Sequence, residues 1–122
     1  MPNAPTKLRI LVVDDEPLIA RALGRVLRHH EVDIASTAEG ARRWLHERRY
    51  DMVVVDLNLG DTSGEDVLVR ADVPLRVLMS GAPPRGALAA KITNGELAWL
   101  DKPFTAHRLE QLVACARGRQ AA

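Results

Sequence analysis

The sequence has one cysteine and almost no net charge, and each shortage excludes a class of protein. Cys115 is the only cysteine among the 122 residues, so neither an internal disulfide nor a zinc site built on several thiolates can form. The formal charge is +1, from 17 basic and 16 acidic residues, which is too small for the basic surface of a typical nucleic-acid-binding protein. We therefore expect no nucleic-acid partner.

Long apolar runs are also missing. No segment approaches the roughly 20 apolar residues that span a bilayer, and residues 1–7 lack the basic and apolar parts of a signal peptide. These features indicate a cytoplasmic protein without a membrane partner. A hydrophobic fraction of 47% and a charged fraction of 27% are typical of a folded globular chain. The length suits one domain, which we predict over residues 1–122 with its core at about 7–117.

Short branched apolar segments alternate with amphipathic ones along the chain. Pro17 suits the first turn of a helix, Ser36 or Thr37 can cap a second, and Thr105 can cap the last. Glu65–Arg70 leaves room for only a short helix, and the prolines and glycines of residues 83–95 shorten any helix there. This alternation predicts a doubly wound α/β fold, a parallel sheet with helices on both faces. The five expected strands are residues 8–13, 32–35, 52–57, 75–79 and 97–100.

Polar side chains stand where these expected strands end. In doubly wound sheets, ligands bind beyond the carboxyl ends of the strands. Asp14 and Asp15 follow the first strand and Asp56 ends the third, so these carboxylates should lie close together and repel one another. Each of the paired acids, taken alone, could instead be a solvated strand end or a helix cap. A carboxylate directly after three valines, as at Asp56, needs compensation, and oxygen ligands of this kind suit Mg2+.

The remaining strand ends supply partners for a phosphoryl group. Ser80 ends the fourth strand and Lys102 follows the fifth. Phosphoryl transfer to a carboxylate requires a nucleophile, a cation that neutralises the phosphoryl oxygens and further donors around them. Asp56 could serve as the nucleophile, with Mg2+, Lys102 and the Ser80 hydroxyl as the other groups. A lysine alone would more often be a surface residue, so this hypothesis rests on the whole set.

Four segments, ILVVDDEP, YDMVVVDLNL, RVLMSGA and WLDKPF, resemble the signature blocks of response-regulator receiver domains, in particular the single-domain chemotaxis regulators. The resemblance extends over nearly the whole chain and implies a flavodoxin-like strand order 2-1-3-4-5. It also implies that Asp15 ligates Mg2+ directly and Asp14 mainly through water. Asp56 would accept the phosphoryl group and bind the metal, and Asn58 would lend its backbone carbonyl.

The resemblance further assigns a switch. Ser80 would move toward the phosphoryl group and Lys102 would contact it, with the Lys102–Pro103 peptide bond in the cis form. Trp99 lies three residues before Lys102, where related receivers often carry an aromatic that swings inward, so we hypothesise the same role for Trp99. Its large indole could instead stay on one face.

The implied function is signalling rather than turnover. A sensor histidine kinase or phosphotransfer protein would donate the phosphoryl group, and the switched domain, a monomer or weak dimer, would bind a downstream protein through its fourth helix, fifth strand and fifth helix. Two rivals remain. One is an interaction module that keeps the fold without phosphorylation. The other is a hydrolase with an aspartate nucleophile, which would usually place a second acid where Asn58 stands.

Two departures from the family pattern affect these expectations. The interval between Asp56 and Ser80 is 24 residues, shorter than the family leads us to expect, and should trim the third helix. The residues PPRG should shorten or distort the fourth helix, which puts the usual output surface in question. Ala82 offers no polar group to orient water, so we predict slow loss of the phosphoryl group.

Overall fold

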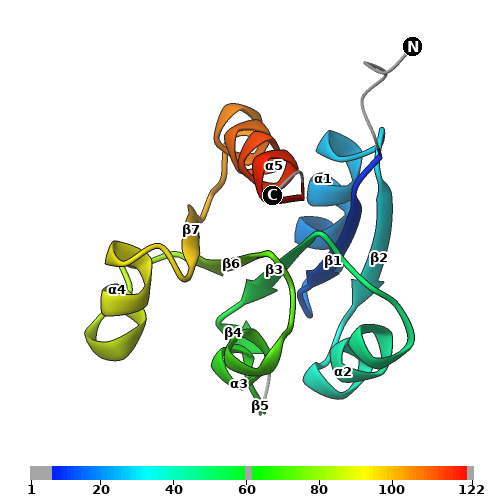
Figure 1. Cartoon of the computed structure of the whole chain (residues 1–122). Helices are drawn as coiled ribbons and strands as arrows, with labels where there is room; N and C mark the ends of the chain where they lie inside the picture. The colour runs from blue at the N-terminus through cyan, green and yellow to red at the C-terminus, as the bar shows by residue number, and fades with distance from the viewer. Residues whose placement is uncertain (1–6, 60–61, 121–122) are drawn as a thin grey trace.

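The computed structural model describes residues 7–59 and 62–120, which contain a five-stranded parallel sheet (Figure 1). The strands lie side by side in the order β2-β1-β3-β6-β7. Counted along the chain without the short β4 and β5, this order is 2-1-3-4-5, so the predicted flavodoxin-like, doubly wound fold is confirmed. The strands are β1 (Arg9–Val13), β2 (Glu31–Ala35), β3 (Met52–Asp56), β6 (Leu75–Ser80) and β7 (Ala98–Asp101).

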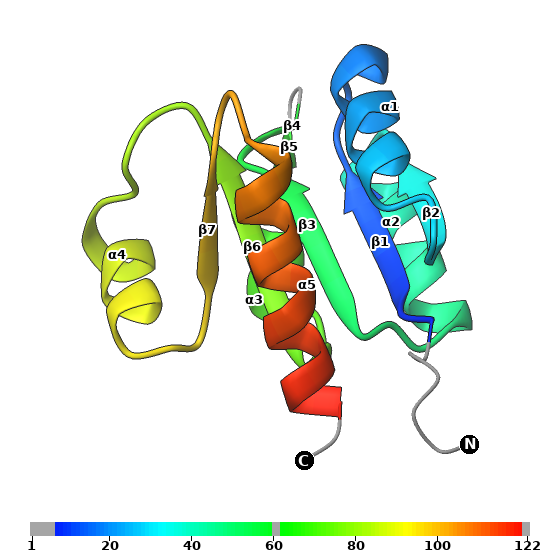
Figure 2. The ribbon, with the colours of Figure 1, turned by 90° about the horizontal axis from the view of Figure 1, so that it is seen from above.

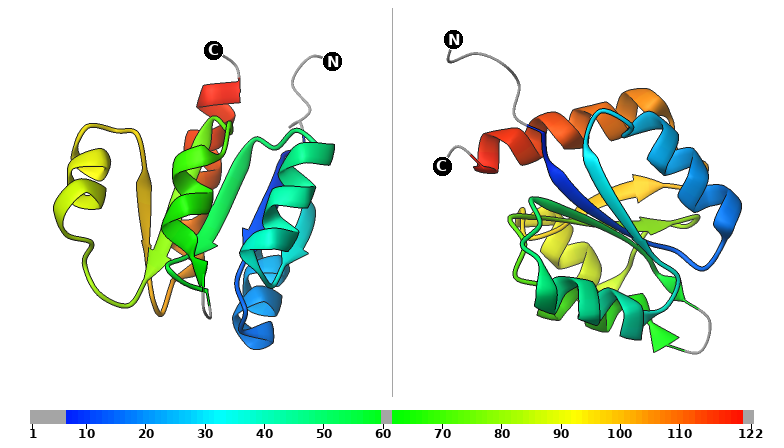
Figure 3. Two further views of the ribbon diagram at one scale, coloured as in Figure 1. Left: turned by 90° about the horizontal axis from the view of Figure 1, so that it is seen from below. Right: turned by 90° about the vertical axis from the view of Figure 1, so that its right-hand side faces the viewer.

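Helices cover both faces of the sheet (Figures 2 and 3). On one face, α1 (Pro17–Val26) and α5 (Ala106–Gln120) pack on the core that includes Ile10. On the other, α2 (Ala38–Glu47) and α3 (Gly64–Arg70) pack on a second core. The three central strands β1, β3 and β6 thus bury both of their faces, which explains why β3 is continuously apolar up to its last residue.

The fourth helix is less buried than the helices that cover the two faces of the sheet. α4 (Gly86–Thr93) lies beyond the edge strand β7 in Figures 1 and 2, and none of its residues, all of which the structure describes, is buried. Leu88 and Ile92 are partly buried and pack against the α2–α3 core. As expected from the PPRG sequence, the helix is short, and it starts at a glycine whose φ is 61°.

Local signals in the sequence mark the starts of three helices. Thr37 caps α2, because its hydroxyl accepts a hydrogen bond from the Gly40 amide at 3.0 Å, and this settles the choice between Ser36 and Thr37. Thr105 accepts in the same way from the Arg108 amide at 3.1 Å, as predicted for the last helix. Pro17 occupies the first turn of α1, also as predicted.

One element was not predicted. The segment after β3, expected as a loop, forms a two-stranded antiparallel hairpin of β4 (Asn58–Leu59) and β5 (Thr62–Ser63). Two residues per strand are too few for a periodic pattern, so the sequence carries no signal for this pairing. The hairpin leads directly into α3 at Gly64, where an added Cβ would lie 2.2 Å from the Asp56 carbonyl oxygen. Only glycine permits so close an approach between α3 and the end of β3.

Within the described residues, no helix combines the length and apolar character required to cross a bilayer.

Candidate functional site

The parallel strands bring the predicted acids together at the carboxyl end of the sheet. Carboxylate oxygens of Asp14, Asp15, Glu16 and Asp56 all lie within 4.8 Å of one another. Asp14 and Asp56 are only 1% exposed, whereas Asp15 and Glu16 stand at the rim. The two buried acids come from β1 and β3, which are neighbours in the sheet. Pairing of these strands therefore builds a site from residues 42 positions apart.

Asp14 is the carboxylate of this cluster whose charge is least compensated by the protein. Its Oδ1 accepts a hydrogen bond from the Glu16 amide at 2.8 Å, but its buried Oδ2 has no hydrogen-bond partner among the described residues. Burial raises the pKa of Asp14 from 3.8 to about 6; the Glu16 amide opposes this shift and the nearby Asp56 carboxylate adds to it. A buried, unsatisfied carboxylate oxygen beside another carboxylate is an environment that a hard cation would stabilise.

Asp56 is held on both of its oxygens. Oδ1 accepts a hydrogen bond from the Asn58 amide at 3.1 Å, and Oδ2 accepts one from the Lys102 ammonium group at 2.9 Å. Burial disfavours the charged form of Lys102, but the hydrogen bond and charge of Asp56 outweigh it, so the pKa of Lys102 is raised. The ammonium group thus remains charged beside the carboxylate.

Ser80 and Trp99 are joined directly. The Ser80 hydroxyl donates to the Ala82 carbonyl oxygen at 2.6 Å and accepts from the Trp99 indole Nε1 at 3.1 Å. The Lys102 amide donates to the Ser80 carbonyl oxygen at 3.0 Å, and the Lys102–Pro103 peptide bond is cis. The ends of β6 and β7 are therefore tied to each other by both backbone and side chains.

Sequence reasoning missed two features of this site. Glu16 belongs to the acid cluster, and its Oε1 lies 3.5 Å from the Lys102 Nζ. A third consecutive acid before Pro17 was a signal that could have identified it. The direct Trp99–Ser80 hydrogen bond carried no sequence signal, because it depends on the register of β6 and β7.

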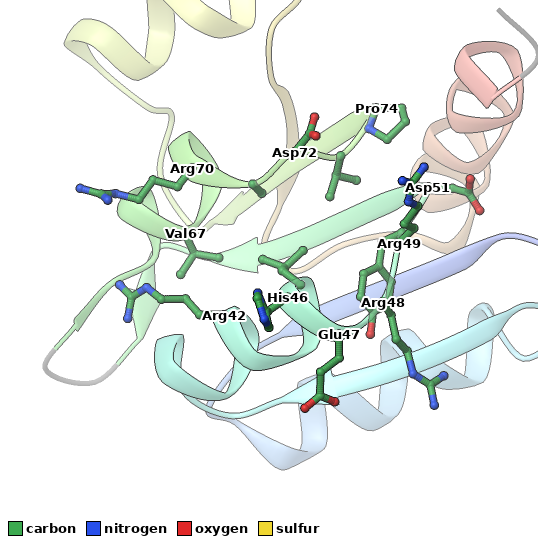
Figure 4. A pocket seen from close by; sticks show the side chains of 14 residues that line it. Arg42, His46, Glu47, Arg48, Arg49, Asp51, Val67, Arg70, Asp72 and Pro74 are labelled. Atoms are coloured by element: carbon green, nitrogen blue, oxygen red, sulfur yellow. The ribbon is translucent and has the colours of Figure 1, made fainter.

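A groove of about 860 Å³ lies between α2 and α3 and extends to Asp51 and Pro74 at the amino end of the sheet (Figure 4). Arg42 and Arg70, which line it, both bind the Asp66 carboxylate, at 2.8 and 2.9 Å. Arg48 lies 3.7 Å from Asp33. These three arginines thus each lie against a carboxylate, and among the described residues no buried side-chain oxygen of the groove lacks a partner, unlike Asp14 Oδ2.

Known proteins resemble this chain in sequence. A family model described as the response regulator receiver domain matches residues 10–114. The chain is 32% identical over 115 residues to the two-component response regulator ARR11 of Arabidopsis thaliana, covering 88% of this chain and 22% of that protein. It is 35% identical over 117 residues to the DNA-binding response regulator MtrA of Mycolicibacterium smegmatis, covering 91% and 50%. The chain thus spans half or less of these curated relatives.

Solved structures agree in fold. The signal receiver domain of an HD domain-containing protein from Pseudomonas fluorescens Pf-5 superposes with a TM-score of 0.83 at 25% identity, covering 96% of this chain and 100% of that one. A CheY-like receiver domain from Methylobacillus flagellatus gives 0.78 at 26% identity, covering 91% and 99%. Since the family match extends over most of the sequence, the predicted resemblance is confirmed, and the chain belongs to the response regulator receiver domains, signalling modules of two-component systems.

Proposed function

We propose that this chain, as one receiver domain with its core at about residues 7–117, is phosphorylated on Asp56 in a Mg2+-dependent reaction. The observation that carries the proposal is the position of Asp56, which is buried at the end of β3 between the unsatisfied Asp14 and the Lys102 ammonium group. Sensor histidine kinases or phosphotransfer proteins are the partners that this family implies. The chain modifies itself and does not act as a turnover enzyme.

The residues of the acid cluster fit a magnesium ion. Asp14, Asp15 and Asp56 would hold it together with the Asn58 backbone carbonyl, and the bound ion would neutralise charge on the phosphoryl oxygens. Carboxylate and carbonyl oxygens are the donors that this ion prefers, and the partnerless Asp14 Oδ2 is one such donor already buried in the cluster.

The transfer itself requires little rearrangement of the protein. An oxygen of Asp56 forms a bond to phosphorus while the phosphorus–nitrogen bond of the donor phosphohistidine breaks. The bonding electron pair stays on the imidazole nitrogen, which takes up a proton from water. Lys102, already 2.9 Å from Asp56 Oδ2, is placed to contact a phosphoryl oxygen.

Ser80 and Trp99 would convert phosphorylation into a change of surface. The Ser80 hydroxyl hydrogen is committed to the Ala82 carbonyl, so donation to a phosphoryl oxygen requires this bond to break. Any movement of Ser80 alters its hydrogen bond with Trp99 on β7. We propose that this couples Asp56 to an output surface of α4, β7 and α5, where a downstream protein binds.

Intact-protein mass spectrometry tests the proposal. The protein is incubated with acetyl phosphate, with and without Mg2+, as wild type, as Asp56→Asn and as Asp51→Asn, a control that removes an acid at the other end of β3. We expect one phosphoryl group in the wild type and in the control with Mg2+, and none in Asp56→Asn. No gain under any condition would instead support an interaction module that acts without phosphorylation.

Trp99 fluorescence tests the switch separately. Trp44→Phe leaves Trp99 as the only tryptophan, and its emission is recorded before and after phosphorylation. We expect a shift that is lost in Ser80→Ala. An unchanged emission spectrum in the phosphorylated protein would refute the role of Trp99 but not the phosphorylation. The same sample reports the phosphoryl lifetime, which we predict to be much longer than seconds because Ala82 cannot orient water.

A further inference from the structure

The Lys102 ammonium group lies between two carboxylates of different character. Asp56 Oδ2 is 2.9 Å away and Glu16 Oε1 is 3.5 Å away. The Asp56 side chain is 1% exposed, whereas the Glu16 side chain is 61% exposed. One partner is therefore buried and fixed, and the other is at the rim and able to adjust.

Metal binding at this site puts two cations in competition. Asp56 belongs to the cluster of carboxylates that could hold a metal ion, and its Oδ2 is already occupied by Lys102. A metal that takes this carboxylate weakens the bond to the ammonium group, and the Lys102 side chain as a whole is only 20% exposed. For a lysine side chain that is largely buried, the loss of its charged partner is unfavourable unless another anion replaces it.

Glu16 is positioned to act as that replacement anion for Lys102. Its backbone amide donates to Asp14 Oδ1 at 2.8 Å, which anchors the residue to the acid cluster. It is the N-cap residue of α1, yet its side chain makes no capping hydrogen bond, so the carboxylate is available for Lys102. The next residue, Pro17, restricts the backbone at this point.

We propose that Glu16 is a positioning residue that takes over the Lys102 ammonium group when Asp56 turns toward the metal. Glu16 would thereby keep Lys102 inside the site, ready for a phosphoryl oxygen, while lowering the free-energy penalty of metal binding. The inference rests on the proposed magnesium site but not on phosphoryl transfer, so it is tested without any phosphoryl donor.

A simpler role for Glu16 must be separated from this one. As a fourth carboxylate of the cluster, Glu16 could attract the metal by charge alone. That direct attraction would be equal or larger when Lys102 is removed, because the ammonium group would no longer offset the charge of Glu16. The positioning role predicts the reverse, an effect of Glu16 that depends on the presence of Lys102.

A double-mutant cycle on magnesium affinity decides between the two. The dissociation constant of Mg2+ is measured by calorimetry for wild type, Glu16→Gln, Lys102→Met and the double variant, with Glu39→Gln in the first turn of α2 as the control. We expect Glu16→Gln to raise the constant roughly fivefold in the presence of Lys102 and less than twofold in the Lys102→Met background. The control should match the wild type.

The other possible results overturn either the positioning role of Glu16 or the magnesium site itself. An equal or larger effect of Glu16→Gln in the Lys102→Met background, or no effect in the presence of Lys102, overturns the positioning role and leaves the magnesium site standing. Absence of Mg2+ binding by the wild type overturns the proposed function together with this inference. Circular dichroism of all the variants establishes that each is folded.

Discussion

At the carboxyl end of the parallel sheet four carboxylates lie together, two of them within 3.5 Å of the Lys102 ammonium group, whereas along the α2–α3 groove Arg42, Arg48 and Arg70 each lie against a carboxylate. Asp14 keeps a buried oxygen without a partner among the described residues. By contrast, Asp66 accepts hydrogen bonds from both Arg42 and Arg70. Both regions are rich in charge, but among the described residues only the carboxylate cluster contains a buried oxygen without a partner.

This difference distinguishes a buried charge that a ligand could stabilise from exposed charges that are already paired. A buried carboxylate without compensation lowers the stability of the ligand-free protein, so it is a group that a bound cation would stabilise. Exposed ion pairs gain little free energy and are screened by salt, so they indicate a solvated surface. The size of a hollow therefore says less about function here than the electrostatic state of the groups around it.

The largest expected effect on stability comes from Gly64, whose backbone packs against the end of β3 at Asp56. An added methyl group in Gly64→Ala would lie 2.2 Å from the Asp56 carbonyl oxygen and 2.9 Å from Val55. We expect the free energy of unfolding to fall by about 3 kcal/mol, measured by urea denaturation. Gly24→Ala, where no described atom lies within 4 Å of the new methyl group, should gain up to about 1 kcal/mol. Equal stabilities of Gly64→Ala and wild type would contradict the close approach.

The second-largest effect on stability should come from neutralising Asp14. In Asp14→Asn we expect the metal-free protein at pH 7 to be more stable by about 2 kcal/mol, because the raised pKa of Asp14 reflects unfavourable burial of its charge. The variant should also lose the rise in Tm that Mg2+ gives the wild type. Asp72→Asn, which changes an acid lining the groove, should keep that rise. A metal-free Asp14→Asn protein that is less stable than wild type would reverse our interpretation.

The pH dependence of stability gives a third, graded test. Asp14 has a folded-state pKa of about 6, above its ordinary 3.8, so it contributes stability that is fully present below pH 3.8 and lost as the pH rises through about 6. We expect the free energy of unfolding of metal-free wild type, relative to Asp14→Asn, to fall by up to about 1 kcal/mol per pH unit in this window. A difference that stays constant between pH 4 and pH 6 would contradict the shift.

The ion pairs of Asp66 beside the α2–α3 groove should give the smallest effect. Hydrogen bonds from Arg42 and Arg70 hold the pKa of Asp66 below its usual value. Asp66→Asn should therefore lower stability only slightly at low salt, and the difference should vanish at high salt, because these groups are exposed. Urea denaturation at two ionic strengths measures both quantities. A loss as large as that of Gly64→Ala would remove the contrast between the carboxylate cluster and the α2–α3 ion pairs.

Much of the fold followed from local patterns. The order of strands and helices, the Thr37 cap and the short α4 all depend on neighbouring residues, so periodicity and capping rules suffice to predict them. The strand boundaries shifted by no more than two residues, as β7 shows by running from Ala98 to Asp101 instead of 97–100. The β4–β5 hairpin escaped prediction because its strands are too short to show a period.

The candidate site was likewise predictable in part from the sequence. Asp14, Asp56, Ser80 and Lys102 could be selected from the sequence because each follows an apolar strand, and parallel strands end at one edge. Their roles in phosphorylation remain predictions. The partnerless Asp14 oxygen, the Glu16–Lys102 contact and the Trp99–Ser80 bond were decided only by the tertiary structure. They depend on strand register and side-chain direction, which arise when distant segments pack together.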